Sequence, residues 1–420
     1  MQKMESQRFS GYRVAAGCGI VIFFHLGCCY IWAAMIPYFL EHFGCSLTLL
    51  SASSALGTLI GFLASFTAGT MLQRLHPRRL LITGTAICAV FMLINAFASA
   101  PWMLYVSNGI SGFILAWGAQ VTCASVINRW FIDKRNTVIG VVFGCSAFGG
   151  ALFMFLAGNL IGTLGQRNMY LLLGAIAVGG ALFSELFLIR DDPEQLGQRA
   201  LGADKGEQAE TVNRRDSDGE DLTPAEARKS RSFFLMIAAT FFGSMLLATF
   251  SSFATTFWTS NGVSQAHAST YASAMTLLGG LVSILVGGVA DRWGIKTFIT
   301  VIFGIFAIGV SMAILWGTVL PAAFVLVLNI IFISAGTPIQ NISSSVTLPV
   351  FGPKAADGIN GTLMAFFYAG SALSVVAFSA LFDLLGSFIP VFVLVLVLAA
   401  AAFSLMMLAI RWAPARQRRL

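Results

Sequence analysis

One histidine lies about halfway along the first long apolar run of the sequence, residues 12–40. His25, Cys29 and Trp32 are spaced i, i+4 and i+7, so a helix would place the three side chains on one face. Ionisable side chains at mid-membrane depth mark proton, ion or substrate sites, and histidine changes charge near physiological pH. His25 is therefore a candidate for proton coupling and for hydrogen bonding to a substrate. The alternative is a neutral histidine bonded to a neighbouring helix.

Uncharged polar and aromatic residues at matching depth in other apolar runs would complete a substrate pocket. Trp117 and Gln120 share a helical face, and Pro338 would kink its helix and free a backbone carbonyl, as at many membrane cavities. Each of these side chains could instead make an ordinary hydrogen bond between helices. The predicted substrate-binding residues are His25, Trp32, Trp117, Gln120, Asn329, Gln340, Asn341 and Tyr368.

The elements that would carry these residues are membrane-spanning helices. The chain is 57% hydrophobic and 10% charged, with a mean hydropathy of +0.83, whereas soluble proteins carry about 25% charged residues. Crossing the hydrocarbon takes about 20 apolar residues. Runs of this length fall near residues 12–40, 47–72, 79–99, 101–128, 136–163, 168–189, 232–260, 266–290, 296–317, 320–348, 355–385 and 387–410. The sequence predicts an all-α membrane protein with twelve transmembrane helices in two six-helix bundles.

A polar stretch between the halves, residues 190–231, holds 19 of the chain's 43 charged residues and cannot bury a core. It ends in Thr223, Pro224 and Glu226, a helix-capping pattern that predicts a short helix leading into the seventh span. The predicted division is an N-terminal bundle, a cytoplasmic linker and a C-terminal bundle, at residues 1–189, 190–231 and 232–420.

The placement of charges predicts the orientation in the membrane. All basic residues except Arg167 fall in the termini, the linker and the breaks on one side, and positive loops face the cytoplasm. Both termini are thus expected in the cytoplasm, in the inner (plasma) membrane. The net charge of +7 follows from this asymmetry and requires no nucleic-acid partner. Glu41, Glu185 and Asp383 fall near the ends of predicted spans, where contact with water at headgroup level would account for them.

The break after the eighth apolar run resembles a family signature. Residues 287–296 read GGVADRWGIK, similar to the Gly-x-x-x-Asp-Arg-x-Gly-x-Lys/Arg loop of the major facilitator superfamily. A carboxylate at a helix end can pair with a nearby Arg and a neighbouring helix N-terminus, which would latch the cytoplasmic side. The first-half loop departs from the signature, with Gln73 and His76 in place of Asp and Gly. The predicted cytoplasmic gate comprises Arg74, Arg78, Lys134, Arg135, Asp291 and Arg292.

Shorter motifs resemble one branch of this superfamily, the monocarboxylate porters and oxalate–formate antiporters. They include WFIDKR at residues 130–135 and GCCYIW at residues 27–32, and the second adds Tyr30 to the predicted substrate-binding residues. The resemblance implies a carboxylate substrate held by buried Arg or Lys in the second half. Here the spans at 265–290 and 355–385 contain neither residue, which is a departure from that pattern.

The predicted function is a secondary active transporter that moves a weak monocarboxylic acid with a proton, by alternating access. This function reconciles the resemblance with the missing Arg and Lys residues, because no net charge need cross the bilayer. Two alternatives stay open: efflux of a neutral or aromatic amphipathic compound, and a transporter-like membrane sensor. Phosphate-loop, His-Glu-x-x-His and Cys-x-x-Cys motifs are absent, so ATP-driven pumping and metal chemistry are unsupported. An enzyme is the least supported class. We expect no cofactor or metal, a monomeric state, and the lipid bilayer, a small-molecule substrate and a proton as partners.

Overall fold

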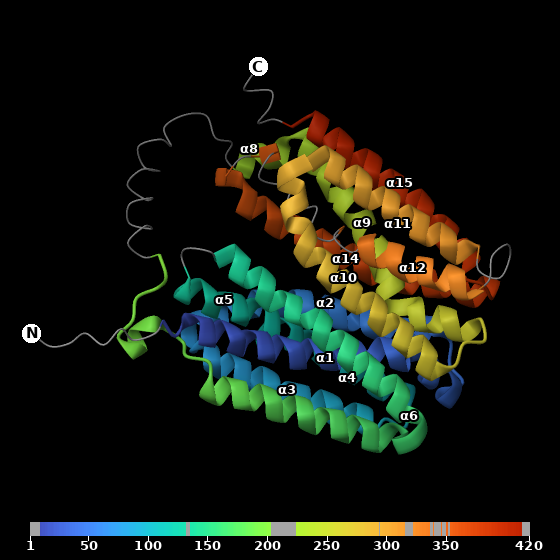
Figure 1. Ribbon diagram of the computed structural model, residues 1–420, viewed down its shortest axis with the longest axis horizontal. Helices are drawn as coiled ribbons and strands as arrows, with labels where there is room; N and C mark the ends of the chain where they lie inside the picture. Colours follow the sequence, from blue (N-terminus) through green and yellow to red (C-terminus); the bar gives the residue numbers. More distant parts are fainter. Residues whose placement is uncertain are drawn as a thin grey trace, which may run out of the picture.

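The computed structural model of the chain describes residues 9–131, 135–202, 224–293, 295–315, 322–336 and 353–413, with positions 339, 346, 350 and 351. Some side chains inside these helices, including those of residues 283–293, lie outside the description. Figure 1 shows long helices packed side by side, with the first half of the chain along the bottom of the view and the second half above it.

The first half begins with α1 (Gly11–Phe43), α2 (Leu47–Arg74) and α3 (Pro77–Ala96). Local sequence sets these boundaries. Gly44, with φ 57°, ends α1 in the left-handed conformation that glycine adopts without strain. The Ser46 hydroxyl accepts a hydrogen bond from the Leu49 N–H and so caps α2, while Pro77 occupies the first turn of α3, where no N–H is needed.

The next span changes its helical type part of the way along. Helix α4 (Pro101–Phe113) continues through a π-helical segment, η1 (Ile114–Gln120), into α5 (Val121–Trp130). π-Helical turns are rare and are often found at functional sites, because the wider turn moves backbone carbonyls out of the regular hydrogen-bond pattern. Two of the predicted substrate-binding residues, Trp117 and Gln120, lie in η1.

Helix α6 (Arg135–Phe187) contains two limbs joined at a sharp turn. The turn is at Gly165, whose φ of 70° and ψ of 169° are non-helical, and Figure 1 shows the green limbs folding back on each other. The break expected near Gly165 is therefore present as a single-residue turn. The first limb packs against α1, and a Cβ at Gly149 would collide with the Phe23 carbonyl, so glycine permits this close approach.

The described part of the second half contains one short helix and six longer ones. They are α8 (Pro224–Lys229), α9 (Arg231–Ser260), α10 (Gln265–Trp293), α11 (Ile295–Ile314), α12 (Ala322–Gly336), α14 (Pro353–Leu385) and α15 (Ile389–Arg411). The short helix predicted at the end of the polar stretch corresponds to α8, although the expected cap, Thr223, lies outside the described residues.

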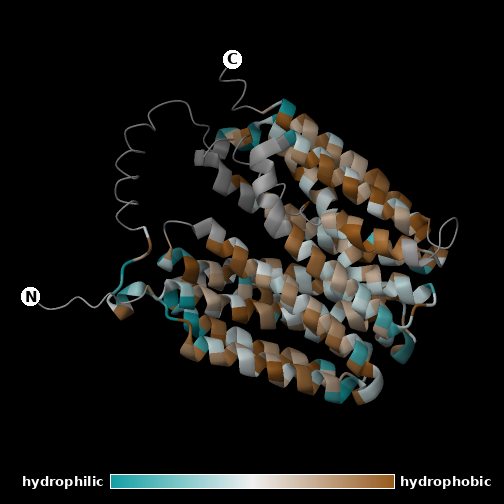
Figure 2. Cartoon of the chain, in the orientation of Figure 1, coloured by the Kyte–Doolittle hydropathy of each residue, from teal (hydrophilic) through white to brown (hydrophobic). Residues whose placement is uncertain are grey.

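Nine segments of the described chain are long and apolar enough to cross a membrane. Figure 2 shows hydrophobic residues along the length of the helices, with hydrophilic residues gathered towards their ends. Large apolar side chains such as Leu63 and Phe183 are exposed on the outer surface, as expected of helices that face lipid. The all-α membrane fold is thus confirmed, whereas the count of twelve crossings and the three-part division of the chain stay predictions.

The two halves contact each other at the end of the helices away from the chain termini. Thr255 of α9 donates a hydrogen bond to the Ala33 carbonyl of α1, and Gln265 of α10 donates to the Ala34 carbonyl. At the same end, the Asp383 carboxylate accepts hydrogen bonds from the backbone N–H groups of Leu47 and Thr48, at 3.1 and 2.8 Å. We expected Asp383 to be solvated by water at headgroup level. That expectation was incomplete, because its carboxylate also bonds to the start of α2.

Candidate functional site

His25 is fully buried between helices of the first half. Its Nδ1 lies 2.7 Å from the Gly118 carbonyl oxygen in η1, and its Nε2 lies 2.8 Å from the Thr85 hydroxyl of α3. A carbonyl oxygen can only accept a hydrogen bond, so Nδ1 must carry a hydrogen. His25 is thus held on both ring nitrogens within one half of the protein, a geometry that suits proton handling better than direct contact with a substrate.

The Thr85 hydroxyl also contacts a buried acid. It is hydrogen bonded to Oε1 of Glu185 in α6 at 2.6 Å. Glu185 is 0% exposed, and its Oε2 has no hydrogen-bond partner among the described residues. The expectation of solvation at headgroup level was wrong for Glu185. His25, Thr85 and Glu185 form a continuous hydrogen-bonded chain, which we call the polar triad.

Close packing of two glycines brings the triad together. A Cβ at Gly84 of α3 would collide with the Gly118 Cα, and a Cβ at Gly118 would lie 2.9 Å from His25 Nδ1. Because neither residue has a side chain, α3 approaches η1 closely, and Thr85 and the Gly118 carbonyl can flank the same imidazole ring. The sequence did not predict the contact between Gly84 and Gly118, since their relative position depends on helix packing.

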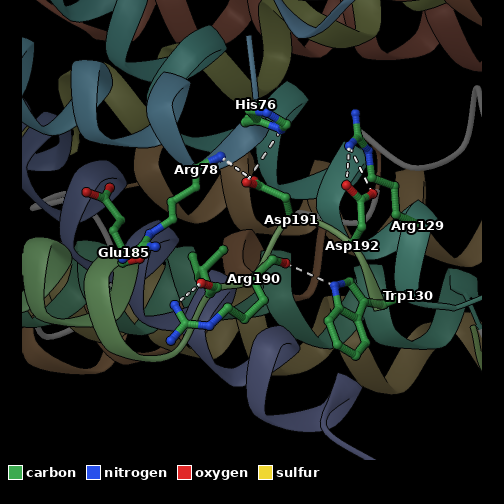
Figure 3. Close-up of polar contacts among 9 residues, drawn as sticks. His76, Arg78, Arg129, Trp130, Glu185, Arg190, Asp191 and Asp192 are labelled. Carbon is green, nitrogen blue, oxygen red and sulfur yellow. Dashed lines mark hydrogen bonds and ion pairs between the residues drawn. The ribbon is translucent and has the colours of Figure 1, made fainter. Parts of the chain in front are cut away.

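Arg78, a predicted gate residue, closes the end of α6 beside the triad. Its Nε donates to the Glu185 carbonyl and its Nη2 to the Leu186 carbonyl, each at 2.7 Å. The Arg78 backbone N–H donates to Asp191 Oδ1 at 2.8 Å. Figure 3 shows the Glu185 carboxylate directed away from the Arg78 guanidinium. These contacts join the start of α3 to the end of α6 and the start of the predicted linker, and the water-excluding cover they provide explains why Glu185 is buried so near a helix end.

The start of the predicted linker packs against the same end of the first half. Arg129 Nη1 lies 3.0 Å from Asp192 Oδ1, and the Trp130 indole N–H donates to the Arg190 carbonyl at 3.0 Å (Figure 3). The Leu201 N–H donates to the Trp130 carbonyl at 2.9 Å. Trp130, which opens the WFIDKR motif, therefore holds the chain that leaves α6.

Two predicted substrate-binding residues, Gln120 and Tyr368, meet where the two halves contact each other, and Trp117 lies in the same π-helical segment as Gln120. The Tyr368 hydroxyl of α14 donates to Gln120 Oε1 of η1 at 3.3 Å, and the rings of Tyr368 and Phe62 of α2 have centroids 6.4 Å apart. The Trp117 indole N–H donates to the Ala64 carbonyl and the Thr67 hydroxyl of α2, at 3.2 and 3.1 Å. This group, Trp117, Gln120 and Tyr368, presents an amide, a hydroxyl and aromatic rings.

The structure places three other predicted substrate residues apart from that group. Asn329 is buried and donates to the Gly309 carbonyl at 2.8 Å, which is a contact between α12 and α11. The Tyr30 ring packs on Gly150 of α6. Trp32 is 8% exposed, and its indole N–H has no partner among the described residues.

Most of the predicted gate residues, and two of the predicted substrate residues, fall outside the described residues or side chains. Arg74 is exposed in the last turn of α2. Outside the described residues or side chains lie Gln340, Asn341, Lys134, Arg135, Asp291 and Arg292. The predicted gate and the substrate residues of the 337–345 segment therefore stay predictions.

Comparisons with known proteins agree with this fold. Residues 18–374 match the Major Facilitator Superfamily. The chain is 23% identical over 177 residues to the uncharacterized MFS-type transporter YhjX of Escherichia coli, covering 42% of this chain and 44% of that protein. It is 29% identical over 149 residues to monocarboxylate transporter 13 of Rattus norvegicus, covering 33% of each chain. The alignments thus span less than half the length of these curated relatives.

The structure also resembles a bacterial homologue of the human lysosomal transporter Spinster, solved in an inward-facing and occupied conformation. The TM-score is 0.70 at 14% identity, over 99% of this chain and 98% of that one. The chain belongs to the Major Facilitator Superfamily and is an integral membrane protein, so the superfamily assignment drawn from residues 287–296 is confirmed.

Proposed function

We propose that this protein is a secondary active transporter that moves a weak monocarboxylic acid together with a proton. The observation that carries the proposal is the buried polar triad, in which a histidine and a glutamate are bridged by one hydroxyl. Ionisable groups are costly inside a membrane protein and are retained there for function. The histidine and the glutamate of the triad are best suited to binding and releasing a proton.

The charge balance of the spans favours an acid accompanied by its proton. An isolated carboxylate is expensive to bury without a cationic partner, and the spans at 265–290 and 355–385 contain no Arg or Lys. The same acid carrying a proton is neutral and needs only hydrogen-bonding groups. The similarity to a rat monocarboxylate transporter supports the same substrate class.

The residues suited to a neutral acid are Trp117, Gln120 and Tyr368. The amide of Gln120 and the hydroxyl of Tyr368 can each donate and accept hydrogen bonds, which matches a carboxyl group that does both. They come from different halves of the chain, and repeat-built transporters bind their substrates at such an interface. We therefore place the substrate at this junction, with the proton held separately by the triad.

Transport by alternating access would require the halves to separate at one end and close at the other. The contacts of Asp383 with Leu47 and Thr48, and of Thr255 with Ala33, hold the end away from the termini closed. We place both termini on the cytoplasmic side of the inner (plasma) membrane. The closed end of the helices, away from the termini, then faces the outside, so the described conformation corresponds to the state closed to the outside.

The proposal is tested by uptake of labelled acetate, lactate and pyruvate into proteoliposomes, with and without an inward proton gradient. We expect gradient-driven uptake that is lost in His25→Gln and retained in His267→Gln. His267 is the matched control because it is exposed at the start of α10 and, among the described residues, its hydrogen bonds are to nearby Ser264. Folded protein that takes up none of the three acids at any gradient contradicts the proposed substrate class.

One observation favours a second candidate, efflux of an aromatic amphipathic compound. The junction holds the rings of Phe62 and Tyr368, Trp117 bonds to Ala64 on the same helix as Phe62, and aromatic rings stack on one another with useful affinity. The two functions differ in a growth assay. Deletion of an efflux protein sensitises cells to aromatic toxicants, whereas loss of an acid–proton symporter impairs growth on a monocarboxylate.

A further inference from the structure

The polar triad contains two hydrogen-bond contacts that compete for one hydroxyl hydrogen. Thr85 Oγ1 lies 2.8 Å from His25 Nε2 and 2.6 Å from Glu185 Oε1. A hydroxyl has a single hydrogen to donate, so it can serve only one of these contacts. The other contact must receive its hydrogen from His25 or from Glu185.

Two arrangements satisfy every contact. In the first, a protonated Glu185 donates to Thr85, and Thr85 donates to a neutral His25. In the second, a doubly protonated His25 donates to Thr85, and Thr85 donates to the Glu185 carboxylate. His25 Nδ1 donates to the Gly118 carbonyl in both. The two arrangements hold the same number of protons, and both carry zero net charge.

Every other protonation state breaks a contact or buries a net charge. Removing one proton leaves two acceptor atoms facing each other at hydrogen-bond distance, together with a buried negative charge. Adding one leaves a buried positive charge, together with either two hydrogens facing each other or an unpaired hydrogen on Glu185 Oε2. Unpaired buried polar groups and buried net charges are both costly. The geometry therefore selects the state with a single exchangeable proton.

We propose that the polar triad is a binding site for one proton, which moves between Glu185 and His25 through the Thr85 hydroxyl. The transfer is balanced within the triad. The proton on Glu185 Oε1 bonds to Thr85 Oγ1 while the original Thr85 hydrogen passes to His25 Nε2, and the reverse transfer restores the first arrangement. No other reactant is needed.

The position of Glu185 makes it the exchange point with water at this end of the helices. Glu185 is two residues from the end of α6, next to the cluster of Arg78, His76 and Asp191 shown in Figure 3. His25 lies deeper, in the middle of α1. Glu185 Oε2 is buried and unpartnered among the described residues, so it offers a free acceptor to an entering proton.

Other ionisable groups face Glu185 from the neighbouring helices. Arg78 of α3 and Cys123 of α5 interact with it electrostatically, and the Cys123 thiol donates a hydrogen bond to the Cys18 carbonyl of α1 at 3.9 Å. None of them lies within hydrogen-bonding distance of the Glu185 carboxylate in the described structure. The proton is thus exchanged between His25 and Glu185, while Arg78 contributes a nearby positive charge.

The site can be tested without any substrate. Infrared difference spectra recorded against pH in purified protein should show one buried protonated carboxylic acid that titrates together with a histidine ring. Glu185→Gln should abolish the carboxylic acid band, whereas Glu41→Gln, at an exposed residue, should leave it intact. A band that persists unchanged in Glu185→Gln would overturn the proposal.

The bridging role of Thr85 needs its own variants. Thr85→Val keeps the shape and removes the hydroxyl, so it should uncouple the histidine and carboxylic acid signals, and Thr85→Ser should restore their coupling. Thr83→Val is the matched control, since Thr83 is exposed on the same helix and, within the described part of the chain, its hydroxyl bonds to the Leu80 carbonyl of its own helix. Coupled titration in Thr85→Val would contradict a relay through this hydroxyl.

Only the use of this proton in transport rests on the proposed function. Infrared coupling without carboxylate uptake would leave the proton site standing and reject the substrate. Gradient-driven carboxylate uptake that is unchanged in Glu185→Gln would keep the proposed function and reject the relay. The two failures are therefore distinguishable.

Discussion

Asp383 accepts two hydrogen bonds from Thr48, one from its backbone N–H at 2.8 Å and one from its hydroxyl at 2.5 Å. These residues lie more than 300 positions apart and join the end of α14 to the start of α2. A carboxylate beside a helix N-terminus is favoured by the helix dipole and by the free N–H groups there. The contact is therefore a latch between the two halves, and it is available to mutation without disturbing the core.

Loss of this latch should open the end of the protein away from the termini. Asp383→Asn removes the negative charge, with an expected cost of about 0.5–1 kcal/mol to the closed state. Cys45 lies in the adjacent connection between α1 and α2, and its labelling by an impermeant maleimide reports the opening when the rates are compared at a pH where each protein's rate has levelled off. We expect faster labelling in Asp383→Asn and the wild-type rate in Glu41→Gln. Equal rates in all three proteins would show that the contact does not hold the closed state.

The pH dependence of the same labelling gives a separate prediction. Burial, and to a lesser extent the Asp383 carboxylate, raise the pKa of the Cys45 thiol. Because only the thiolate reacts, wild-type labelling should rise at a pH above the usual thiol pKa of about 8.5. Asp383→Asn removes a nearby negative charge, so the rise should move to lower pH. A profile that is unshifted, or shifted upward, contradicts the assignment, and Cys45→Ser identifies the reacting thiol.

Gly118 should tolerate no side chain. The Cβ introduced by Gly118→Ala would lie 2.9 Å from His25 Nδ1 and 3.3 Å from the Gly84 Cα, so His25 must move from its carbonyl partner. We expect a loss of about 1–3 kcal/mol of stability from overpacking and loss of proton-driven uptake. Gly162→Ala is the matched control, because Gly162 faces open space. Thermal unfolding in detergent and uptake measure the two effects, and a fully active Gly118→Ala protein would contradict them.

Arg78 should stabilise the first half through the end of α6. Arg78→Gln removes two charge-assisted hydrogen bonds to carbonyls, which predicts a loss of about 1–3 kcal/mol. Arg79→Gln, at the exposed neighbouring residue, should unfold at the wild-type temperature. Thermal unfolding distinguishes this structural role from the predicted gate role. A variant with wild-type stability but impaired uptake would favour the gate.

Tyr368 should act on the substrate more than on the fold. Tyr368→Phe removes only the hydroxyl that reaches Gln120 at 3.3 Å, so we expect KM for the transported acid to rise several-fold with little change in unfolding temperature. Tyr271→Phe, in α10, provides the control for loss of a tyrosine hydroxyl elsewhere. Unchanged KM and kcat in Tyr368→Phe would remove Tyr368 from the substrate site.

Some candidate residues were identified individually but their partners were not. Gln120 and Tyr368 were both predicted from their depth, while their contact joins residues 248 positions apart. Asn329 was predicted on the same grounds, and the structure shows its amide bonded to the Gly309 carbonyl, between α12 and α11. Depth can be read from the position of a residue along a span, but the neighbour that a side chain faces depends on the rotation and packing of helices.

The sequence by itself determined the class of the protein, because long apolar runs leave a chain no soluble alternative and because the 287–296 loop carries a superfamily signature. It also singled out His25 as an ionisable residue far from any span end. Only the tertiary structure decided that Glu185 is buried, since Arg78 and the 188–192 segment cover the end of α6. The close approach of Gly84 to Gly118 likewise set Thr85 between His25 and Glu185, because helix packing, rather than spacing along the chain, brings these three residues together.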